Sequence, residues 1–293
     1  MMKLRFMKYR KLSYWIAGAF ILLSVLSLML RGLNYGIDFA GGISMEVTPV
    51  EQSYTIDKMR TDLEQFNPEL QSVGDSGAIL IRVGLHKGAT DAEQNARVTE
   101  IKDILGNKVE YSQVQIVGPK IGGELVRGGI LAILFSFILM SVYVWVRYRG
   151  GYAIGSFISL CLDFVIMFGF FSITGLEFNQ TAIAVILMGV GYSINDKVVN
   201  YDRIEENIRK YHKMPMDDLI DLSVNEMMRR TIMTGLSTIL AMVALFLFGG
   251  PALRDFSIAM TFAVVMGTFT SIYISNVILY HFNLRDDSIP NGK

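Results

Sequence analysis

The chain has 293 residues, of which 52% are hydrophobic and only 18% are charged. A soluble domain usually carries about a quarter charged residues, so this composition indicates a membrane protein. The net charge is zero, which argues against binding to nucleic acid. A single cysteine, Cys161, excludes an intramolecular disulfide, and three widely spaced histidines give no metal-ligand spacing. We therefore expect no metal, no cofactor and no catalytic cluster.

Six stretches are long and apolar enough to cross a bilayer, which takes about 20 residues. They are Leu12–Leu30, Gly129–Val146, Tyr152–Gly175, Gln180–Val199, Thr231–Phe248 and Phe256–Tyr280. The fourth is the weakest, because its second half is polar. The first follows a basic segment but lacks a convincing cleavage site, so we interpret it as a retained anchor rather than a signal peptide.

Lysine and arginine mark the side on which each connection lies. The N-terminus and the second-to-third and fourth-to-fifth connections are basic, whereas the other short connections carry one basic residue or none. Both termini are therefore expected in the cytoplasm. The predicted organisation is a cytoplasmic N-terminus (1–11), a first span (12–30), an external domain with linkers (31–127), a five-helix membrane domain (128–281) and a cytoplasmic tail (282–293).

The segment between the first two spans has the composition of a soluble domain and the pattern of alternating strands and helices. The expected elements are strand Ile37–Thr48, helix Thr55–Phe66, strands Leu70–Val73 and Ala78–Val83 around a Gly-Asp-Ser-Gly turn, helix Thr90–Leu105 and strand Val109–Val117. The order βαββαβ is that of a ferredoxin-like fold. Gly118–Gly123 lacks the Lys-Ser/Thr of a phosphate loop and is interpreted as a linker.

Asp163 lies near the middle of the third span. An aspartate at a span centre costs about 2.5–3.5 kcal/mol on insertion scales, so it is expected to face a partner or a watery cavity. A hydrogen-bonded structural aspartate in a helix contact is the alternative.

The fourth span carries a stripe of polar residues at helical spacing, in which Asp196 shares a face with Tyr192 and Arg203. Gly189 and Gly191 would permit close helix approach. Lys197 lies about 100° round the helix from Asp196, so it does not pair with it on one face and is expected to extend toward the cytoplasmic interface. The alternative is that the span ends near Ile194 and leaves Asp196 interfacial. The charged residues from Asp202 to Arg209 are expected to form a solvated helical extension.

The fifth span begins with Arg230, followed on the same face by Thr234 and by Ser237 or Thr238. Together with Asp163 and Asp196, this face would give a polar path among the inner helices. The alternative is that these side chains act as hydrogen-bonding glue between helices.

Four motifs resemble the SecF family, the smaller membrane subunit of the SecDF complex of bacterial protein export within the RND superfamily. They are "YGIDFAGG" (Tyr35–Gly42), "VGPKIGGEL" (Val117–Leu125), "GYSINDKVVNYDRIEENIRK" (Gly191–Lys210) and "RRTIMTGLSTILAMVALFLFGG" (Arg229–Gly250). The resemblance covers nearly the whole chain and implies an RND-type half of six transmembrane helices. It implies that Asp163, Asp196, Arg230 and Thr234 belong to a proton pathway. The motif positions it implies to be structural are Gly36, Asp38, Gly41, Gly42, Gly118, Pro119, Gly191, Asn195, Asp202 and Arg203. Two positions depart from the pattern: Lys197 replaces a serine or threonine, which would change the protonation of Asp196, and Asn200 replaces a small or apolar residue.

The resemblance also implies a role that is not enzymatic. Members of this family pair with SecD, associate with the SecYEG channel and often with YajC, and use the proton-motive force to complete export of the preprotein across the bacterial inner membrane. No nucleic-acid partner is implied, and lipid surrounds the spans. Two alternatives remain: half of an RND-type small-molecule exporter, which predicts two halves and large external domains in one chain, and a non-conducting scaffold of the translocon. The sequence leaves open whether protons or sodium ions are coupled.

Overall fold

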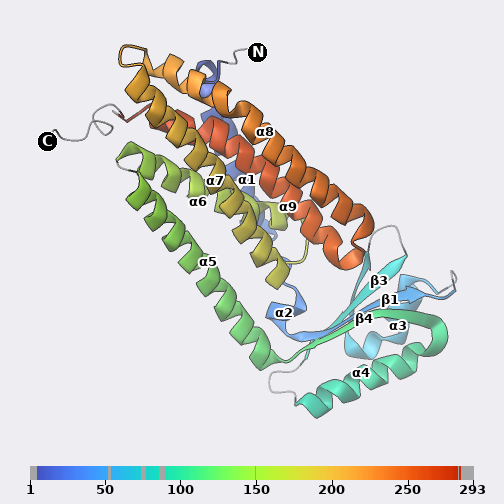
Figure 1. The fold of residues 1–293 in the computed structure, drawn as a ribbon. Helices are drawn as coiled ribbons and strands as arrows, with labels where there is room; N and C mark the ends of the chain where they lie inside the picture. Colours follow the sequence, from blue (N-terminus) through green and yellow to red (C-terminus); the bar gives the residue numbers. More distant parts are fainter. Residues whose placement is uncertain are drawn as a thin grey trace. The chain divides into compact units, whose positions relative to one another are not determined.

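The computed structural model describes residues 5–51, 54–73, 77–85, 90–148, 150–282 and 284, which form two compact units. The first unit comprises the chain up to Asn34, Ala132–Leu176 and the chain from Thr181 onward. The second comprises Tyr35–Leu131 together with Glu177–Gln180. Figure 1 labels the helices and strands of both units.

Among the described residues, six helices are long and apolar enough to cross a membrane. Their cores are α1 (Arg10–Leu30), α5 (Pro119–Arg147), α6 (Gly151–Thr174), α7 (Gln180–Lys210), α8 (Met216–Phe248) and α9 (Pro251–Phe269). A short 3₁₀ turn, η1 (Met7–Tyr9), precedes α1. The last span continues from α9 through a π-helical turn, η4 (Thr270–Ser275), into α10 (Asn276–Leu279). The six predicted spans are confirmed, although several helices extend well beyond the apolar stretches that predicted them.

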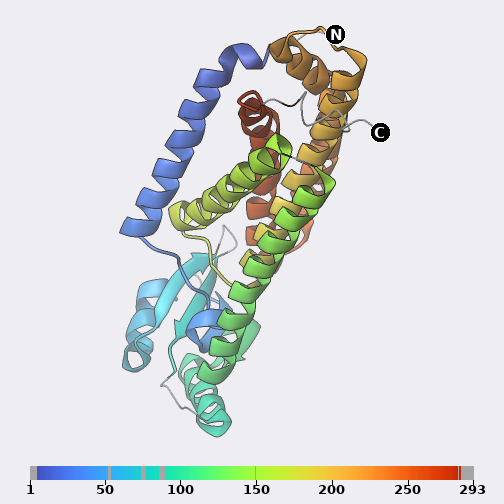
Figure 2. The ribbon, with the colours of Figure 1, turned by 90° about the vertical axis from the view of Figure 1, so that its left-hand side faces the viewer.

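The spans divide into inner and outer helices. In the most apolar windows of α6, α7 and the α9 span, 61%, 50% and 67% of residues are buried, against 17%, 6% and 11% for α1, α5 and α8. Helix α1 packs against α6 (Figure 2), and α8 packs along α9 (Figure 1). The outer helices therefore present broad apolar faces for lipid or for other membrane helices.

The charged end of α7 is a continuous helix that packs closely against α8. Tyr201, Ile204 and Ile208 of α7 share a buried cluster with Leu219 and Ile220 of α8. The charged residues from Asp202 to Arg209, expected to be solvated, are exposed or half-buried, whereas the apolar residues between them recur at helical spacing and form a buried face. On the outer face the expected ion pairs are confirmed, between Arg203 and Glu206 and between Arg209 and Glu205, at 2.5 Å each.

The second unit contains a four-stranded antiparallel sheet in the order β2-β3-β1-β4. The strands are β1 (Gly42–Pro49), β2 (Glu69–Val73), β3 (Ala78–Val83) and β4 (Val109–Val117). The helices are α2 (Ile37–Ala40), α3 (Ile56–Asp62) and α4 (Asp91–Leu105), with 3₁₀ turns η2 (Glu64–Phe66) and η3 (Gly106–Lys108). This order confirms the predicted ferredoxin-like fold. The core forms where Met45 and Ile81 of the sheet meet Met59 of α3 and Ile101 of α4, all of them fully buried.

Two local expectations in this unit are wrong. Ile37–Ala40 is a short helix, so the strand predicted from Ile37 begins only at Gly42. Gly42 has φ +151°, and a Cβ there would lie 2.8 Å from the Val83 carbonyl oxygen, so a glycine is needed where the chain enters the sheet.

The segment interpreted as a glycine-rich linker begins α5 at Pro119, because proline fits the first helical turn, where no backbone N–H is needed. Three residues of the Gly-Asp-Ser-Gly turn, 74–76, lie outside the described residues.

A carboxylate at the end of α3 predicts an acid-sensitive contribution to stability. Lys108 Nζ and Tyr54 Oη both donate to Asp62 Oδ2 at 2.8 Å. The Lys108 contact, and then the Tyr54 hydroxyl, lower the pKa of Asp62 below its ordinary value. The contribution is therefore complete above that ordinary value and is lost as the pH falls through the lowered pKa. In thermal unfolding between about pH 7 and about pH 3, the advantage of wild type over Asp62→Asn should shrink toward zero at the acid end. An advantage independent of pH would contradict this assignment.

Candidate functional site

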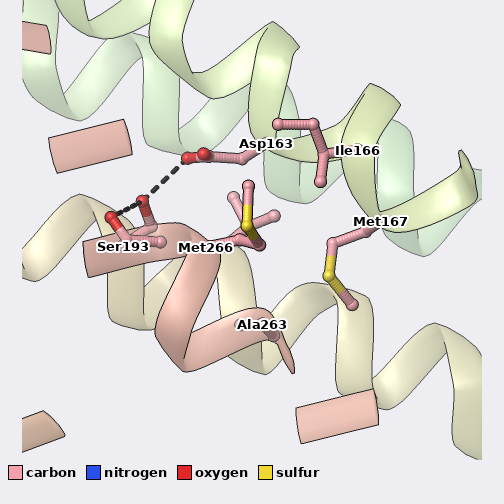
Figure 3. A pocket seen from close by; sticks show the side chains of 9 residues that line it. Asp163, Ile166, Met167, Ser193, Ala263 and Met266 are labelled. Carbon is pink, nitrogen blue, oxygen red and sulfur yellow. Dashed lines mark hydrogen bonds between the residues drawn. The ribbon is translucent and has the colours of Figure 1, made fainter. Parts of the chain in front are cut away.

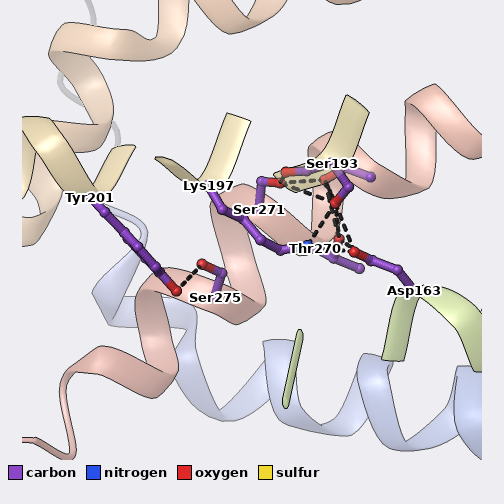
Figure 4. A network of polar contacts seen from close by, with 8 residues as sticks. Asp163, Ser193, Lys197, Tyr201, Thr270, Ser271 and Ser275 are labelled. Carbon is purple, nitrogen blue, oxygen red and sulfur yellow. Dashed lines mark hydrogen bonds and ion pairs between the residues drawn. The ribbon is translucent and has the colours of Figure 1, made fainter. Parts of the chain in front are cut away.

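Asp163 of α6 is 5% exposed, and its carboxylate is fully engaged (Figure 4). Ser193 Oγ of α7 donates to Oδ2 at 2.8 Å, and Thr270 Oγ1 of η4 donates to Oδ1 at 2.5 Å. Lys197 Nζ of α7 forms an ion pair with Oδ2. Two elements, α7 and η4, thus converge on the carboxylate of α6 in the interior of the first unit, and Asp163 faces partners, as its position in the sequence predicts.

Lys197 is fully buried, so the expectation that it extends toward an interface is wrong. Its ammonium group contacts Asp163 and also donates to Ser193 Oγ at 2.7 Å. Lys197 does not share a face of α7 with Asp196, as the sequence predicts, but its side chain takes a different direction from the one expected. The rotation of about 100° turns Lys197 inward toward α6 rather than outward toward water. A buried ammonium is tolerable because its counter-charge lies beside it.

The π-helical turn η4 brings several hydroxyl groups to this pair. Ser271 Oγ donates to the Ser193 carbonyl at 3.0 Å and to the Gly267 carbonyl at 2.7 Å. The Gly267 carbonyl also accepts from Thr270 at 3.1 Å and from Ser193 at 3.3 Å. One turn farther, Ser275 donates to the buried Tyr201 hydroxyl at 2.7 Å. Irregular π-turns of this kind often occur at functional positions of helices.

A small cavity lies beside the Asp163 carboxylate (Figure 3). Its volume is about 10 Å³, close to the smallest space that holds one water molecule. Apart from Asp163 and Ser193, its lining is apolar or glycine, and it includes Met167, Ala263 and Met266. The cavity therefore leaves room for about one water and for no larger ligand.

Asp196 forms a separate group on another side of α7. It is 5% exposed, and within the described part of the chain its Oδ2 has no hydrogen-bond partner. The charged groups that act on it are Arg230 of α8 and Lys197. Helix α7 continues past this point to Lys210, so the helix itself does not end near Ile194.

The hydroxyl stripe of α8 is largely satisfied along its own helix. Tyr192 Oη of α7 contacts Thr234 Oγ1 at 3.3 Å, while Ser237 and Thr238 donate to the Thr234 carbonyl at 2.9 and 3.0 Å. Arg230 lies on an exposed face of α8 and makes no ion pair with the described residues. The four candidate residues thus separate: Asp163 pairs with Lys197, which is not one of the candidates, whereas Asp196, Arg230 and Thr234 lie on the α7–α8 side.

Three residues of the cluster around Asp163 are not predicted from the sequence: Ser193, Thr270 and Ser271. A signal exists for Ser193, because it precedes Lys197 by four residues and so shares its face. Thr270 and Ser271 follow Gly267 in an apolar span, which gives no indication of what they face.

The motif residues near the second unit fix the connection between α6 and α7. Asp38 Oδ2 accepts from the Gln180 backbone N–H at 3.1 Å, and the Gly36 N–H donates to the Phe178 carbonyl at 3.0 Å. A Cβ on Gly36 would lie 3.0 Å from Asn179 Cβ, and one on Gly118 would lie 3.1 Å from Gln94 Nε2. These contacts explain why Gly36, Asp38 and Gly118 are needed within this unit. Gly41, with φ +71°, ends α2, and Pro119 begins α5.

The remaining motif residues lie on α7. Asp202 accepts from Arg147 at 2.5 Å and from the Tyr148 hydroxyl at 2.8 Å, and Arg203 donates to Glu226 at 2.6 Å. These pairs join α7 to its neighbours at its charged end. A Cβ added to Gly191 would meet no described atom within 4 Å, and the Asn195 side chain is exposed. Contacts among the described residues therefore explain neither Gly191 nor Asn195.

Comparison with known proteins agrees with this architecture. Residues 97–285 match the family model "Protein export membrane protein SecD/SecF, C-terminal", and residues 26–49 match the "SecD/SecF GG Motif". The protein translocase subunit SecF of Rickettsia rickettsii is 42% identical over 286 residues, covering 94% of this chain and 91% of the relative. SecF of Rickettsia felis is 41% identical over 289 residues, covering 96% and 92%.

Two solved structures share the fold. SecDF of Thermus thermophilus, a translocon-associated membrane protein, has a TM-score of 0.81 at 30% identity and is matched over 94% of this chain. SecDF in its super-membrane-facing form has a TM-score of 0.68 at 29% identity. This chain spans only 38% and 39% of those two chains. The family models, the full-length relatives and the six-helix architecture agree, and the chain therefore belongs to the SecD/SecF family of protein export membrane proteins, on its SecF branch.

Proposed function

We propose that this multi-pass transport protein pairs with a separate SecD chain, and that the pair uses the proton-motive force in late steps of preprotein export. The solved SecDF chains are more than twice as long as the part this chain matches. A SecD chain would supply the remainder. The proton pathway proposed for this chain comprises Asp163, Asp196, Arg230 and Thr234.

The observation that carries the proposal is the state of Asp196. Its carboxylate is buried, one of its oxygens has no hydrogen-bond partner among the described residues, and Arg230 approaches it from α8. Ionisable groups inside a membrane protein usually pair with one another or line an ion path. An unsatisfied buried oxygen is costly unless a proton, a water or a partner group reaches it. Such a carboxylate can take up and release a proton as its surroundings change.

The exposed polar groups near Asp196 support completion by a second chain. Asn195 is exposed on α7 and Arg230 on the adjoining α8, and beyond Arg230 the exposed residues of α8 are mostly apolar. Lipid tails cannot satisfy an amide or a guanidinium group. The helices of a SecD partner would cover this face and place the groups in an interior.

The charge pattern supports the placement that we propose in the cell. Basic residues in the N-terminus and in the α5–α6 and α7–α8 connections support cytoplasmic termini and a periplasmic second unit, in a bacterial inner membrane. The family relationship extends the proposal to contacts with SecYEG, with YajC and with the emerging preprotein. Among the described residues no group of three metal-ligating side chains occurs, and the proposal invokes no cofactor.

The test is removal of charge in the assembled complex. Asp196→Asn and Arg230→Met are expected to co-purify with SecD while proton-driven export in vesicles falls to the level measured without the complex. Matched controls are Asp218→Asn and Arg229→Met, two exposed residues on α8 that should leave export unchanged. If both test variants export preprotein normally and efflux of small molecules is also unchanged, the chain acts as a non-conducting scaffold. If preprotein export is normal but efflux of small molecules is lost, the chain is half of a small-molecule exporter.

A further inference from the structure

The Lys197 ammonium group lies in a cluster of polar oxygen atoms. Asp163 and the Ser193 hydroxyl contact Nζ directly, and Thr270 Oγ1 lies on the other carboxylate oxygen of Asp163. The Gly267 carbonyl lies in the same cluster, because it accepts from both Ser193 and Thr270. One carboxylate and one hydroxyl therefore contact the ammonium group directly, and a second hydroxyl and a carbonyl lie one hydrogen bond farther out.

This donor set is the kind that a dehydrated alkali cation requires. Carboxylate, hydroxyl and carbonyl oxygens replace the water shell of such an ion, and carbonyls of irregular helices commonly provide part of it in membrane transporters. Here the π-helical turn η4 provides the irregular backbone, and the Gly267 carbonyl lies three residues before it in α9. The charge also fits, because one carboxylate balances one monovalent cation.

We propose that Lys197 is a covalently attached occupant of an alkali-cation site, and that it thereby makes this chain independent of sodium. The proposal rests on the proton-driven transport role proposed above and adds to it a structural reason why sodium does not take the place of the proton. With the ammonium group in place, the site is neutral and its oxygens are engaged. A sodium ion could enter only if Lys197 left, because the adjoining cavity of about 10 Å³ admits about one water and offers mostly apolar walls.

Removing the ammonium group should therefore create a sodium site. Lys197→Ser leaves a negatively charged Asp163 among hydroxyl and carbonyl oxygens and supplies one more hydroxyl. An unpaired buried carboxylate must recruit a cation or a proton. At mildly alkaline pH, where protonation is less favourable, sodium is expected to bind.

The experiment measures binding of radiolabelled sodium to the detergent-purified complex with SecD, with potassium and choline as competitors. Wild type and Lys197→Arg are expected to show no saturable binding. Lys197→Ser and Lys197→Ala should each bind close to one sodium ion per chain, and the additional change Asp163→Asn should abolish it. Two variants of different size are used because either one could fail to assemble, and co-purification with SecD identifies an assembled variant.

Saturable sodium binding to wild type that Asp163→Asn abolishes would overturn the proposal, as would assembled Lys197→Ser and Lys197→Ala complexes that bind none. Wild-type vesicles provide an independent arm. Proton-driven export should be equal with and without sodium, and a strict need for sodium would contradict the assignment. Export that responds to neither gradient would instead refute the proposed function, so the two failures are distinguishable.

Discussion

Asp163→Asn is expected to destabilise the helical unit by about 3–5 kcal/mol, the usual cost of removing one partner from a buried ion pair. The variant would leave the fully buried Lys197 ammonium group without its counter-charge, and an asparagine amide cannot replace that charge. The measurement is denaturant or thermal unfolding of the purified chain with its partner. Lys210→Met, on the exposed surface of the same helix as Lys197, should change stability by less than about 0.5 kcal/mol.

The double variant Asp163→Leu with Lys197→Met separates charge from packing. Replacing both partners of a buried pair by apolar side chains is often neutral or stabilising, so the double variant should recover most of the loss. A double variant as unstable as Asp163→Asn would show that the ion pair is not the source of the effect. Because Asp163 also belongs to the proposed proton pathway, a double variant that folds normally should still lose proton-driven export.

Gly189→Ala and Gly191→Ala are expected to change stability in opposite directions although they lie two residues apart. A Cβ on Gly189 would lie 2.5 Å from Ala263 Cβ of α9, so α7 and α9 must separate, at a cost of about 1–3 kcal/mol. A Cβ on Gly191 meets nothing within 4 Å among the described residues, so alanine should stabilise the helix by up to about 1 kcal/mol. Thermal unfolding of the two purified variants under identical conditions measures the contrast.

Equal effects of the two substitutions would contradict the packing. A stabilised Gly191→Ala that no longer co-purifies with SecD would have a different meaning: this glycine would then lie against the partner. The prediction from sequence that both glycines permit close helix approach is thus confirmed within this chain at Gly189 and not at Gly191.

The second unit is largely predictable because its signals are local. The Thr90 side chain accepts from the Glu93 N–H at 3.4 Å, and the Glu93 carboxylate accepts in return from the Thr90 N–H at 2.8 Å, a capping box that begins α4 at the expected position. Strand β4 has the predicted bounds because apolar and polar residues alternate on both sides of a single interruption at Ser112–Gln113, where its register against β1 shifts. The helix at Ile37–Ala40 is not predictable in this way, because four residues between glycines carry too little periodicity to distinguish a helical turn from a strand.

The buried ion pair of Asp163 and Lys197 cannot be predicted from the sequence, for a different reason. Periodicity places Asp163 inside a span and separates Lys197 from Asp196, but it gives no information on which helices become neighbours. The pairing depends on α6, α7 and η4 meeting at one level, and η4 itself is an irregular turn in an otherwise ordinary apolar stretch. A single lysine in a span is compatible with reaching water or with reaching inward, and only the partner across the helix interface decides.

The lengths of α7 and α8 have a mechanical consequence. At about 1.5 Å per residue, helices of 31 and 33 residues measure about 46 and about 50 Å, whereas the hydrocarbon layer is about 30 Å thick. Unless both helices tilt steeply, about 15 Å or more of this helical hairpin extends into the aqueous phase. Its two helices are held together there by the buried contacts of Tyr201, Ile204 and Leu219. Because each helix is continuous, a change of its tilt within the bilayer moves the end of the hairpin outside the membrane. Such a movement can act on a protein bound at that end.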